Sequence, residues 1–186
     1  PAPNFGEVMG MPYGVSDAIA GSITNDDISF PGVAVRSADS PGLIMTYHEV
    51  LFLQAEAAAR GYTSADAAML YTDAITASMQ FWGVADADIT TYLAQPEVAF
   101  DAGSAVQSVM EQKWLGMYMQ GIEAWNDWRR TGFPALQPAP AAAENRGIPL
   151  RRAYTNDEYS LNRENVEAAV ARQGADVMET AVWWDQ

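Results

Sequence analysis

The 186-residue sequence has no cysteine and only one histidine, His48. The missing thiols exclude disulfide bonds, cysteine nucleophiles and cysteine-ligated zinc sites. A Ser-His-Asp triad or a histidine-rich metal centre would depend on His48 alone. Because His48 lies inside an apolar run of helical character, we predict a structural role for it. We therefore predict no catalytic residue, no metal site and no cofactor.

Basic residues and long apolar runs are also scarce. Ten Lys and Arg stand against 24 Asp and Glu, and the formal net charge is −14. Such acidity disfavours binding to nucleic acid and to anionic lipid. No apolar run reaches the roughly 18 residues that span a membrane. The opening PAPNFGEVMG lacks an initiator methionine and the parts of a signal peptide, so we expect a processed or truncated chain.

Apolar residues are nevertheless abundant enough for a packed core, at 49% of the chain. Residues 1–43 are rich in Gly, Pro, Ser and Asn, which predicts loops with one short extended piece near 28–35. Residues 44–83 predict two helices, the first ending at Gly61 and the second capped by Ser64. Their connection is short, so the two helices must form an antiparallel hairpin like a tetratricopeptide (TPR) unit.

The rest of the chain predicts further helices and no strands, which gives a mainly α fold class. Residues 84–132 predict a short helix capped by Asp86 or Asp88, then one long core helix from about Ser104 to Thr131. Residues 133–186 predict a loop-rich segment with one helix from Asn162 to Gly174. The proline- and alanine-rich stretch PALQPAPAAAEN belongs to those loops.

A helical wheel divides the long helix into two faces. The glycine in the apolar face predicts a close helix crossing. The apolar face consists of Val106, Met110, Trp114, Met117, Tyr118, Gly121, Ile122, Trp125 and Trp128. The polar face consists of Gln112, Lys113, Gln120, Glu123, Asp127 and Arg130.

Two groups of acidic residues resemble known sites, one a glycosidase carboxylate pair and the other a calcium-binding loop. Glu123 and Asp127, four residues apart, have the residue types of a glycosidase carboxylate pair. Arg130, three residues after Asp127, favours an ordinary surface ion pair instead.

The second pattern is Asp86, Asp88 and Glu97, at positions 1, 3 and 12 of an EF-hand-like count. The glycine required at position 6 is missing, and helix capping accounts for both aspartates. We therefore do not predict a calcium site.

Ligand contacts in such a protein are expected in its loops. Asn4 and Tyr13 lie in the irregular N-terminal segment, and Trp183 lies in the C-terminal tail. These three are the predicted ligand-binding residues.

Six segments in the same order resemble the C-terminal part of the SusD/RagB family of nutrient-binding outer-membrane lipoproteins. They cover about residues 8–185, and the fourth of them resembles the SusD-like subgroup. The segments are YHEVLFLQAEAAARGY, AAMLYTDAITASMQFWGV, YLAQPEVAFD, VMEQKWLGMYMQGIEAWNDWRRTGFP, IPLRRAYTNDEYSLNRENV and VWWD.

The resemblance implies a partial SusD-like fold, with residues 1–186 as the C-terminal portion of a SusD-like domain. It implies a protein on the outer face of a Gram-negative outer membrane, held by a lipid anchor absent from this chain. It also implies that the protein is not an enzyme, and that it hands oligosaccharides or peptides to a SusC-like TonB-dependent transporter.

The residues alone leave two other functions open. A TPR-like adaptor would bind only protein, and a helical glycosidase would use Glu123 and Asp127.

Overall fold

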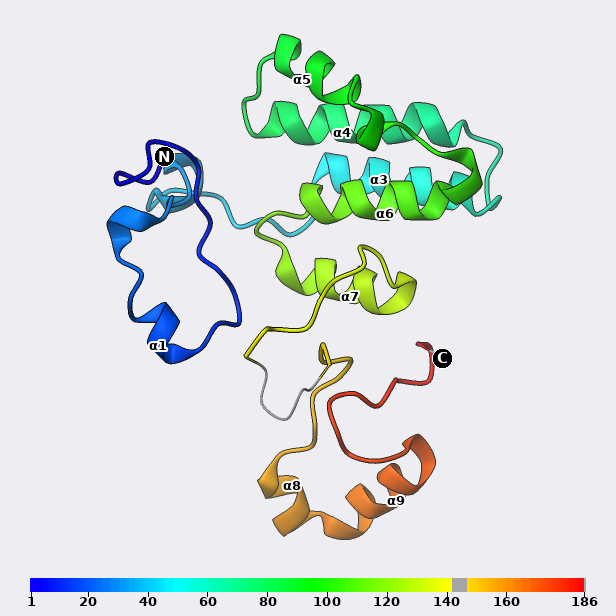
Figure 1. Ribbon diagram of the computed structural model, residues 1–186. Helices are drawn as coiled ribbons and strands as arrows, with labels where there is room; N and C mark the ends of the chain where they lie inside the picture. The colour runs from blue at the N-terminus through cyan, green and yellow to red at the C-terminus, as the bar shows by residue number, and fades with distance from the viewer. Residues whose placement is uncertain (142–146, 186) are drawn as a thin grey trace. The chain divides into compact units, whose positions relative to one another are not determined.

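The computed structural model describes residues 1–141 and 147–185, and its regular elements there are helices (Figure 1). This confirms the predicted mainly α fold class. The chain forms two compact parts. We call Ser37–Ala135 the helical unit, and Pro1–Arg36 with Leu136–Gln186 the loop-rich unit.

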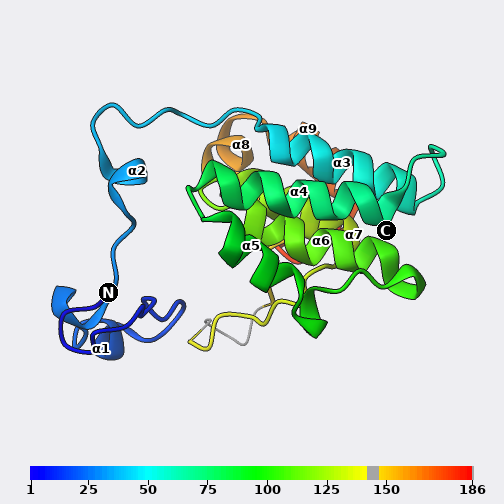
Figure 2. The ribbon, with the colours of Figure 1, turned by 90° about the horizontal axis from the view of Figure 1, so that it is seen from above.

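The helical unit is built on α3 (Tyr47–Ala59) and α4 (Ala67–Phe81), which lie side by side as the predicted hairpin (Figure 2). The first helix begins after Thr46, whose hydroxyl accepts from the Glu49 amide at 3.3 Å in a capping box. Gly61 follows the first helix with a φ of 74°, as predicted for a terminating glycine.

The predicted cap of the second helix is wrong. Asp66, not Ser64, precedes α4, and its carboxylate accepts from the amides of Ala68 and Met69 at 2.9 and 3.1 Å. An ionised carboxylate satisfies two unpaired amides at the positive end of a helix and is therefore a strong cap.

The single long helix predicted from Ser104 to Thr131 is also wrong. The structure has two helices, α6 (Ala105–Gly116) and α7 (Gly121–Thr131), separated by residues 117–120. Met119 lies in that break with a φ of 72°, a left-handed conformation that cannot continue a right-handed helix. The chain therefore changes direction, and a wheel drawn through the break assigns the wrong faces.

The core lies between α3, α4 and α6. Its fully buried residues include Phe52, Ala74 and Val109. The close approach occurs at Gly116, where an added Cβ would lie 2.8 Å from Phe52 Cε2. The crossing predicted at Gly121 is wrong, because nothing lies within 4 Å of a Cβ added there.

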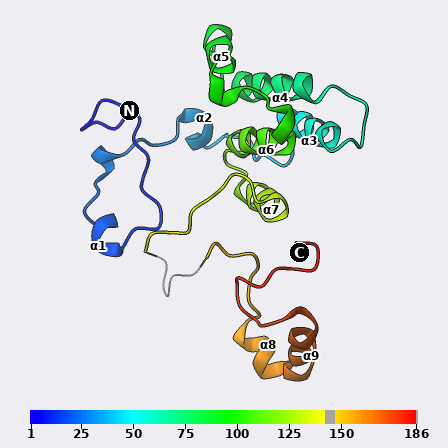
Figure 3. The same cartoon turned by 45° about the vertical axis from the view of Figure 1, so that its right-hand side comes forward.

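Shorter elements complete the helical unit. Helix α5 (Asp86–Leu93) lies against α4, and α7 lies against α6 (Figures 1 and 3). Two short 3-10 helices, η2 (Pro96–Val98) and η3 (Ala102–Ser104), lead into α6.

In its described residues, the loop-rich unit has four helices and one 3-10 turn. These are α1 (Asp17–Ala20), η1 (Asn25–Asp27), α2 (Val33–Arg36), α8 (Asn156–Leu161) and α9 (Arg163–Gln173). The predicted last helix is confirmed by α9 and its terminating Gly174. The prediction of extended chain near residues 28–35 is wrong at its C-terminal end, where α2 begins. Helix α8 was not predicted. Part of the predicted PALQPAPAAAEN loop falls on residues 142–146, outside the described residues.

Candidate ligand-binding site

The side chain of Asn4 is engaged within the N-terminal segment. Its amide donates to Asp27 Oδ1 at 2.6 Å, and Asp27 also accepts from the amide and hydroxyl of Thr24, both at 2.8 Å. These bonds, that from Asn4 above all, hold the pKa of Asp27 below its usual value. Asn4 therefore helps to fix the fold of this segment, and its predicted ligand contact stays a prediction.

Tyr13 has a fixed hydroxyl and an exposed ring. The hydroxyl donates to the carbonyl of Gln137 at 2.6 Å, while 64% of the residue remains exposed. The neighbouring Gly14 carbonyl accepts from the Ala141 amide at 2.7 Å. Tyr13 therefore stands where two distant segments are joined, and its predicted ligand contact stays a prediction.

Trp183 is 85% exposed, more than Tyr13 at 64%. It lines a hollow of about 370 Å³, which we call the Trp183 hollow, together with Arg151, Tyr154, Arg172 and Gln173. Neither Asn4 nor Tyr13 lines it. The Trp183 hollow therefore does not bring the three predicted residues together, and the ligand contact of Trp183 stays a prediction.

Asp176 organises the wall of the Trp183 hollow. Its carboxylate accepts from Arg151 Nη2 at 2.8 Å, from the Tyr154 amide at 3.1 Å and from the Tyr159 hydroxyl at 2.9 Å. The Arg151 and Asp176 side chains are only 9% and 8% exposed. The bond to Asp176 raises the pKa of the Tyr159 hydroxyl.

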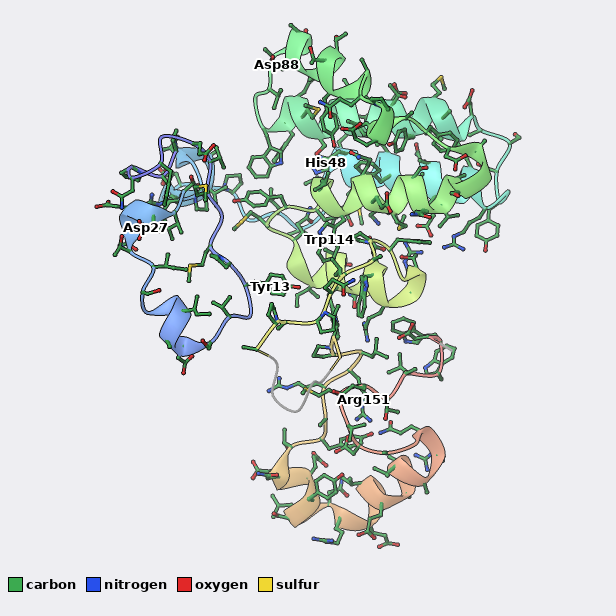
Figure 4. All side chains as sticks on the ribbon, in the orientation of Figure 1. Tyr13, Asp27, His48, Asp88, Trp114 and Arg151 are labelled. Carbon is green, nitrogen blue, oxygen red and sulfur yellow. The ribbon has the colours of Figure 1, made fainter. Side chains whose placement is uncertain are left out.

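Arg151, labelled in Figure 4, is held on its other sides as well. Its guanidinium lies 5.2 Å from the centre of the Tyr154 ring. Its Nη1 lies 2.6 Å from the Gln173 amide, whose oxygen accepts from it once the amide is turned to satisfy both groups. The hollow thus combines an exposed indole with a wall of fixed polar groups. Such a surface can stack against a ring and hydrogen-bond its substituents.

The wall residues were missed from the sequence. Arg151 and Tyr154 lie more than 20 residues before Asp176, and no motif marks the pairing. The double arginine in IPLRRAY was the only visible signal.

The helical unit presents an aromatic row along α3, α4 and the start of the α6–α7 break. Ring centres are 5.4 Å apart for His48 and Phe81, 5.0 Å for Phe81 and Trp82, and 5.5 Å for Trp82 and Tyr118. Phe81 and Tyr118 are each 47% exposed. The assignment of Tyr118 to the apolar face of one long helix is therefore wrong, because the chain turns there.

His48 closes the inner end of this row (Figure 4). It is 2% exposed, and its Nε2 lies 3.1 Å from the carbonyl oxygen of Gly116. Burial lowers the pKa of His48 despite the favourable contacts with Gly116 and Glu49. The predicted structural role is confirmed, since the ring packs and hydrogen-bonds inside the helical unit.

The two carboxylates suggested for catalysis line one hollow but differ in their partners. Asp127 is bonded by Lys113 and Arg130, both at 2.7 Å, and Arg130 also forms a bidentate pair with Glu56. Glu123 remains exposed. Asp127 is therefore committed to two cations, whereas a glycosidase needs both carboxylates to face the sugar. The predicted Asp127–Arg130 pair is confirmed, and the arrangement favours it over a glycosidase.

The wheel assignment fails at other positions too. Lys113 and Gln120, assigned to the polar face, are 3% and 7% exposed, whereas Ile122, assigned to the apolar face, is 70% exposed. Trp125 is half-buried, with the Arg129 guanidinium 3.8 Å from its ring centre. The half-buried set also includes Trp114, labelled in Figure 4, and Trp128.

The EF-hand-like pattern lies in a helix rather than a loop. The residue preceding α5 is Ala85, so the predicted capping by Asp86 or Asp88 is wrong; both lie in the first helical turn. Asp88 lies on α5 in Figure 4. In the parts of the chain that the structure describes, no three acidic or histidine side chains gather as a metal site. No described helix is long and apolar enough to cross a membrane.

Comparison with known families gives a match over most of the chain. A SusD-like family model, described as "Starch-binding associating with outer membrane", matches residues 2–155. No curated protein matches the sequence.

Solved structures are similar in fold and sequence. A SusD-like protein of Bacteroidetes AC2a is 33% identical, with 80% of this chain and 31% of that chain covered and a TM-score of 0.73. A SusD homolog from Bacteroides fragilis is 29% identical, with coverages of 92% and 40% and a TM-score of 0.73. A chitin-binding SusD homolog from Flavobacterium johnsoniae is 29% identical, with coverages of 77% and 36% and a TM-score of 0.67. The chain spans well under half of the length of each of these structures.

Proposed function

Since this chain belongs to the SusD-like family, we propose that it binds nutrient glycans at the bacterial outer membrane. The observation that carries the proposal is the family match over residues 2–155. The family description names starch, and the Flavobacterium relative is described as chitin-binding. Both are neutral polysaccharides, so capture of glycan chains is the function these relatives support best.

The Trp183 hollow is the proposed place of capture. Sugar rings have an apolar face that stacks on exposed indole, and Trp183 offers such a surface at little cost in side-chain entropy. The polar wall, fixed through Asp176, is suited to hydrogen-bonding sugar hydroxyls without reorganisation. The ligand is held and released without chemical change.

The proposal extends to delivery of the glycan. A SusC-like TonB-dependent transporter would receive it, and the full-length protein would be lipid-anchored at the cell surface. The words "associating with outer membrane" in the family description support this arrangement. Co-purification from solubilised outer membranes tests it, and the expected partner is a TonB-dependent transporter. Recovery of soluble proteins alone would contradict delivery.

Calorimetry tests the binding itself. The chain is titrated with malto-oligosaccharides, chito-oligosaccharides and short peptides. We expect a glycan to bind, and Trp183→Ala to weaken that binding by at least about tenfold because the stacking surface is lost. Tyr62→Ala, at a 77% exposed aromatic in the helical unit, is the matched control and leaves affinity unchanged. If no glycan binds the unaltered chain, the proposal fails.

A second candidate is a TPR-like adaptor that binds only protein. The exposed aromatic rings of Phe81 and Tyr118 at the end of the helical hairpin favour it. Two measurements distinguish the candidates. An adaptor binds no glycan, and it loses its protein partner when Phe81 is replaced by alanine.

A further inference from the structure

The Trp183 hollow has an unusual charge for a chain with a formal net charge of −14. Two guanidinium groups, Arg151 and Arg172, line it, and its described lining residues include no carboxylate. Arg151 is neutralised by Asp176 at 2.8 Å. Arg172 has neither an ion-pair nor a hydrogen-bond partner within residues 1–141 and 147–185, and it is exposed. One positive charge at the hollow is therefore unmatched.

The sequence of α9 explains why Arg172 lacks a partner. The positions three and four residues before it are Ala169 and Ala168, so its helix offers no carboxylate at the favourable spacings. Asp176, four residues after it, lies beyond the end of the helix, and its oxygens already accept from Arg151, Tyr154 and Tyr159. Arg163, at the other end of α9, pairs with Glu167 at 3.4 Å.

Together these groups specify a class of ligand. An exposed indole stacks against a sugar ring, and a guanidinium binds a carboxylate with two parallel hydrogen bonds. We propose that the Trp183 hollow selects saccharides that carry carboxylates, with a uronate ring on Trp183 and its carboxylate paired with Arg172. This rests on the proposed glycan-binding function and assigns a ligand class to the same site.

A matched pair of ligands tests the charge directly. The chain is titrated at low salt with an oligogalacturonate and with its fully methyl-esterified form, which has the same backbone without the charge. We expect the free acid to bind about threefold to tenfold more tightly, as for one partly exposed charge-assisted pair. Raising the salt concentration should reduce the difference.

Variants assign the effect to the residues named. Arg172→Gln should remove the preference for the free acid while leaving the esterified form bound as before. Arg163→Gln removes a charge on the same helix outside the hollow and should keep the preference. Trp183→Ala should weaken both ligands. Circular dichroism of each variant checks that the helices are intact, and exposed Arg172 is not required for them.

Equal affinity for the free acid and the ester would overturn the inference. An equal loss on Arg163→Gln would also overturn it, because the preference would then reflect net charge alone. Tighter binding of a free-acid peptide than of the oligogalacturonate would overturn the saccharide assignment. Binding of neutral malto- or chito-oligosaccharides without any acid preference leaves the proposed function standing and removes this inference. Absence of binding to every glycan removes both.

Discussion

Glu56 links separate parts of the helical unit through its two carboxylate oxygens. It is 5% exposed, pairs with Arg60 at 2.8 Å and forms a bidentate pair with Arg130 of α7. Arg130 in turn bonds Asp127, which pairs with Lys113 of α6. The network therefore ties α3, α6 and α7 together, and Lys113, Asp127 and Arg130 belong to it although the wheel assigned them to the polar face.

We predict that Glu56→Gln lowers the free energy of unfolding at pH 7 by about 2–4 kcal/mol, since two guanidinium groups lose their carboxylate. Urea denaturation followed by circular dichroism measures it. Asp73→Asn, at an exposed position of α4, is the control and should change the value by less than about 0.5 kcal/mol. A similarly small effect of Glu56→Gln would show that the network contributes little.

The same carboxylate predicts a pH dependence. Burial alone would raise the pKa of Glu56, but the bonds and charges of Arg130 and Arg60 outweigh it and hold the pKa below 4.5. A depressed pKa in the folded state means that the stabilisation is complete above pH 4.5 and is lost as the pH falls through the folded-state pKa. The stability difference between the unaltered protein and Glu56→Gln should therefore shrink on acidification below pH 4.5. A difference that stays constant down to pH 2 would contradict this.

Among the structural elements, the α6–α7 break is flanked by two glycines, Gly116 and Gly121, that should respond oppositely to alanine. At Gly116 an added Cβ meets Phe52 at 2.8 Å and Ser78 Oγ at 3.4 Å, so Gly116→Ala should destabilise by about 1–3 kcal/mol. At Gly121 nothing lies within 4 Å, so Gly121→Ala should be neutral or stabilise by up to about 1 kcal/mol. Thermal unfolding of the two variants measures both. If Gly121→Ala is the less stable variant instead, the close helix crossing lies at Gly121, as the sequence predicted.

Met119 provides a second test of the break. Its φ of 72° is costly for a β-branched residue and free for glycine. Met119→Gly should therefore be at least about 1 kcal/mol more stable than Met119→Val. At Leu115, exposed within helical α6, the order should reverse because valine is the better helix former. If the valine variant is the more stable one at position 119 as well as at position 115, residues 117–120 continue the helix.

These elements show which features local sequence determines. The α3–α4 hairpin was predicted because short connections and terminating glycines act within a few residues. The break was not predicted, since apolar residues continue through 117–119 and no glycine or proline marks the change of backbone at Met119 and Gln120, where φ is 72° and −117°. Asp66 was passed over for Ser64 because both are good caps two residues apart, and the backbone decides between them.

For the whole molecule, the candidate site depended on contacts that are distant in sequence. Trp183 was predicted from its place in the tail, as an aromatic residue in irregular chain. The polar wall beside it was not, because Arg151 and Asp176 are joined by a pairing across 25 residues. A sequence pattern can mark an exposed ring, but only the fold places charged side chains around it.

The two units should also differ in their resistance to local opening. The buried hydrophobic cluster lies in the helical unit, where Phe52, Ala55 and Ala74 are fully buried. In the loop-rich unit, α9 has one buried side chain, that of Val166, and α8 has none. Amide exchange slows where opening must expose a core. We therefore predict the slowest exchange in the middle of α3 and α4, and exchange at least about tenfold faster throughout α8 and α9, as measured by mass spectrometry on the intact chain. Equal protection in α9 and α4 would mean that the chain opens as one cooperative unit.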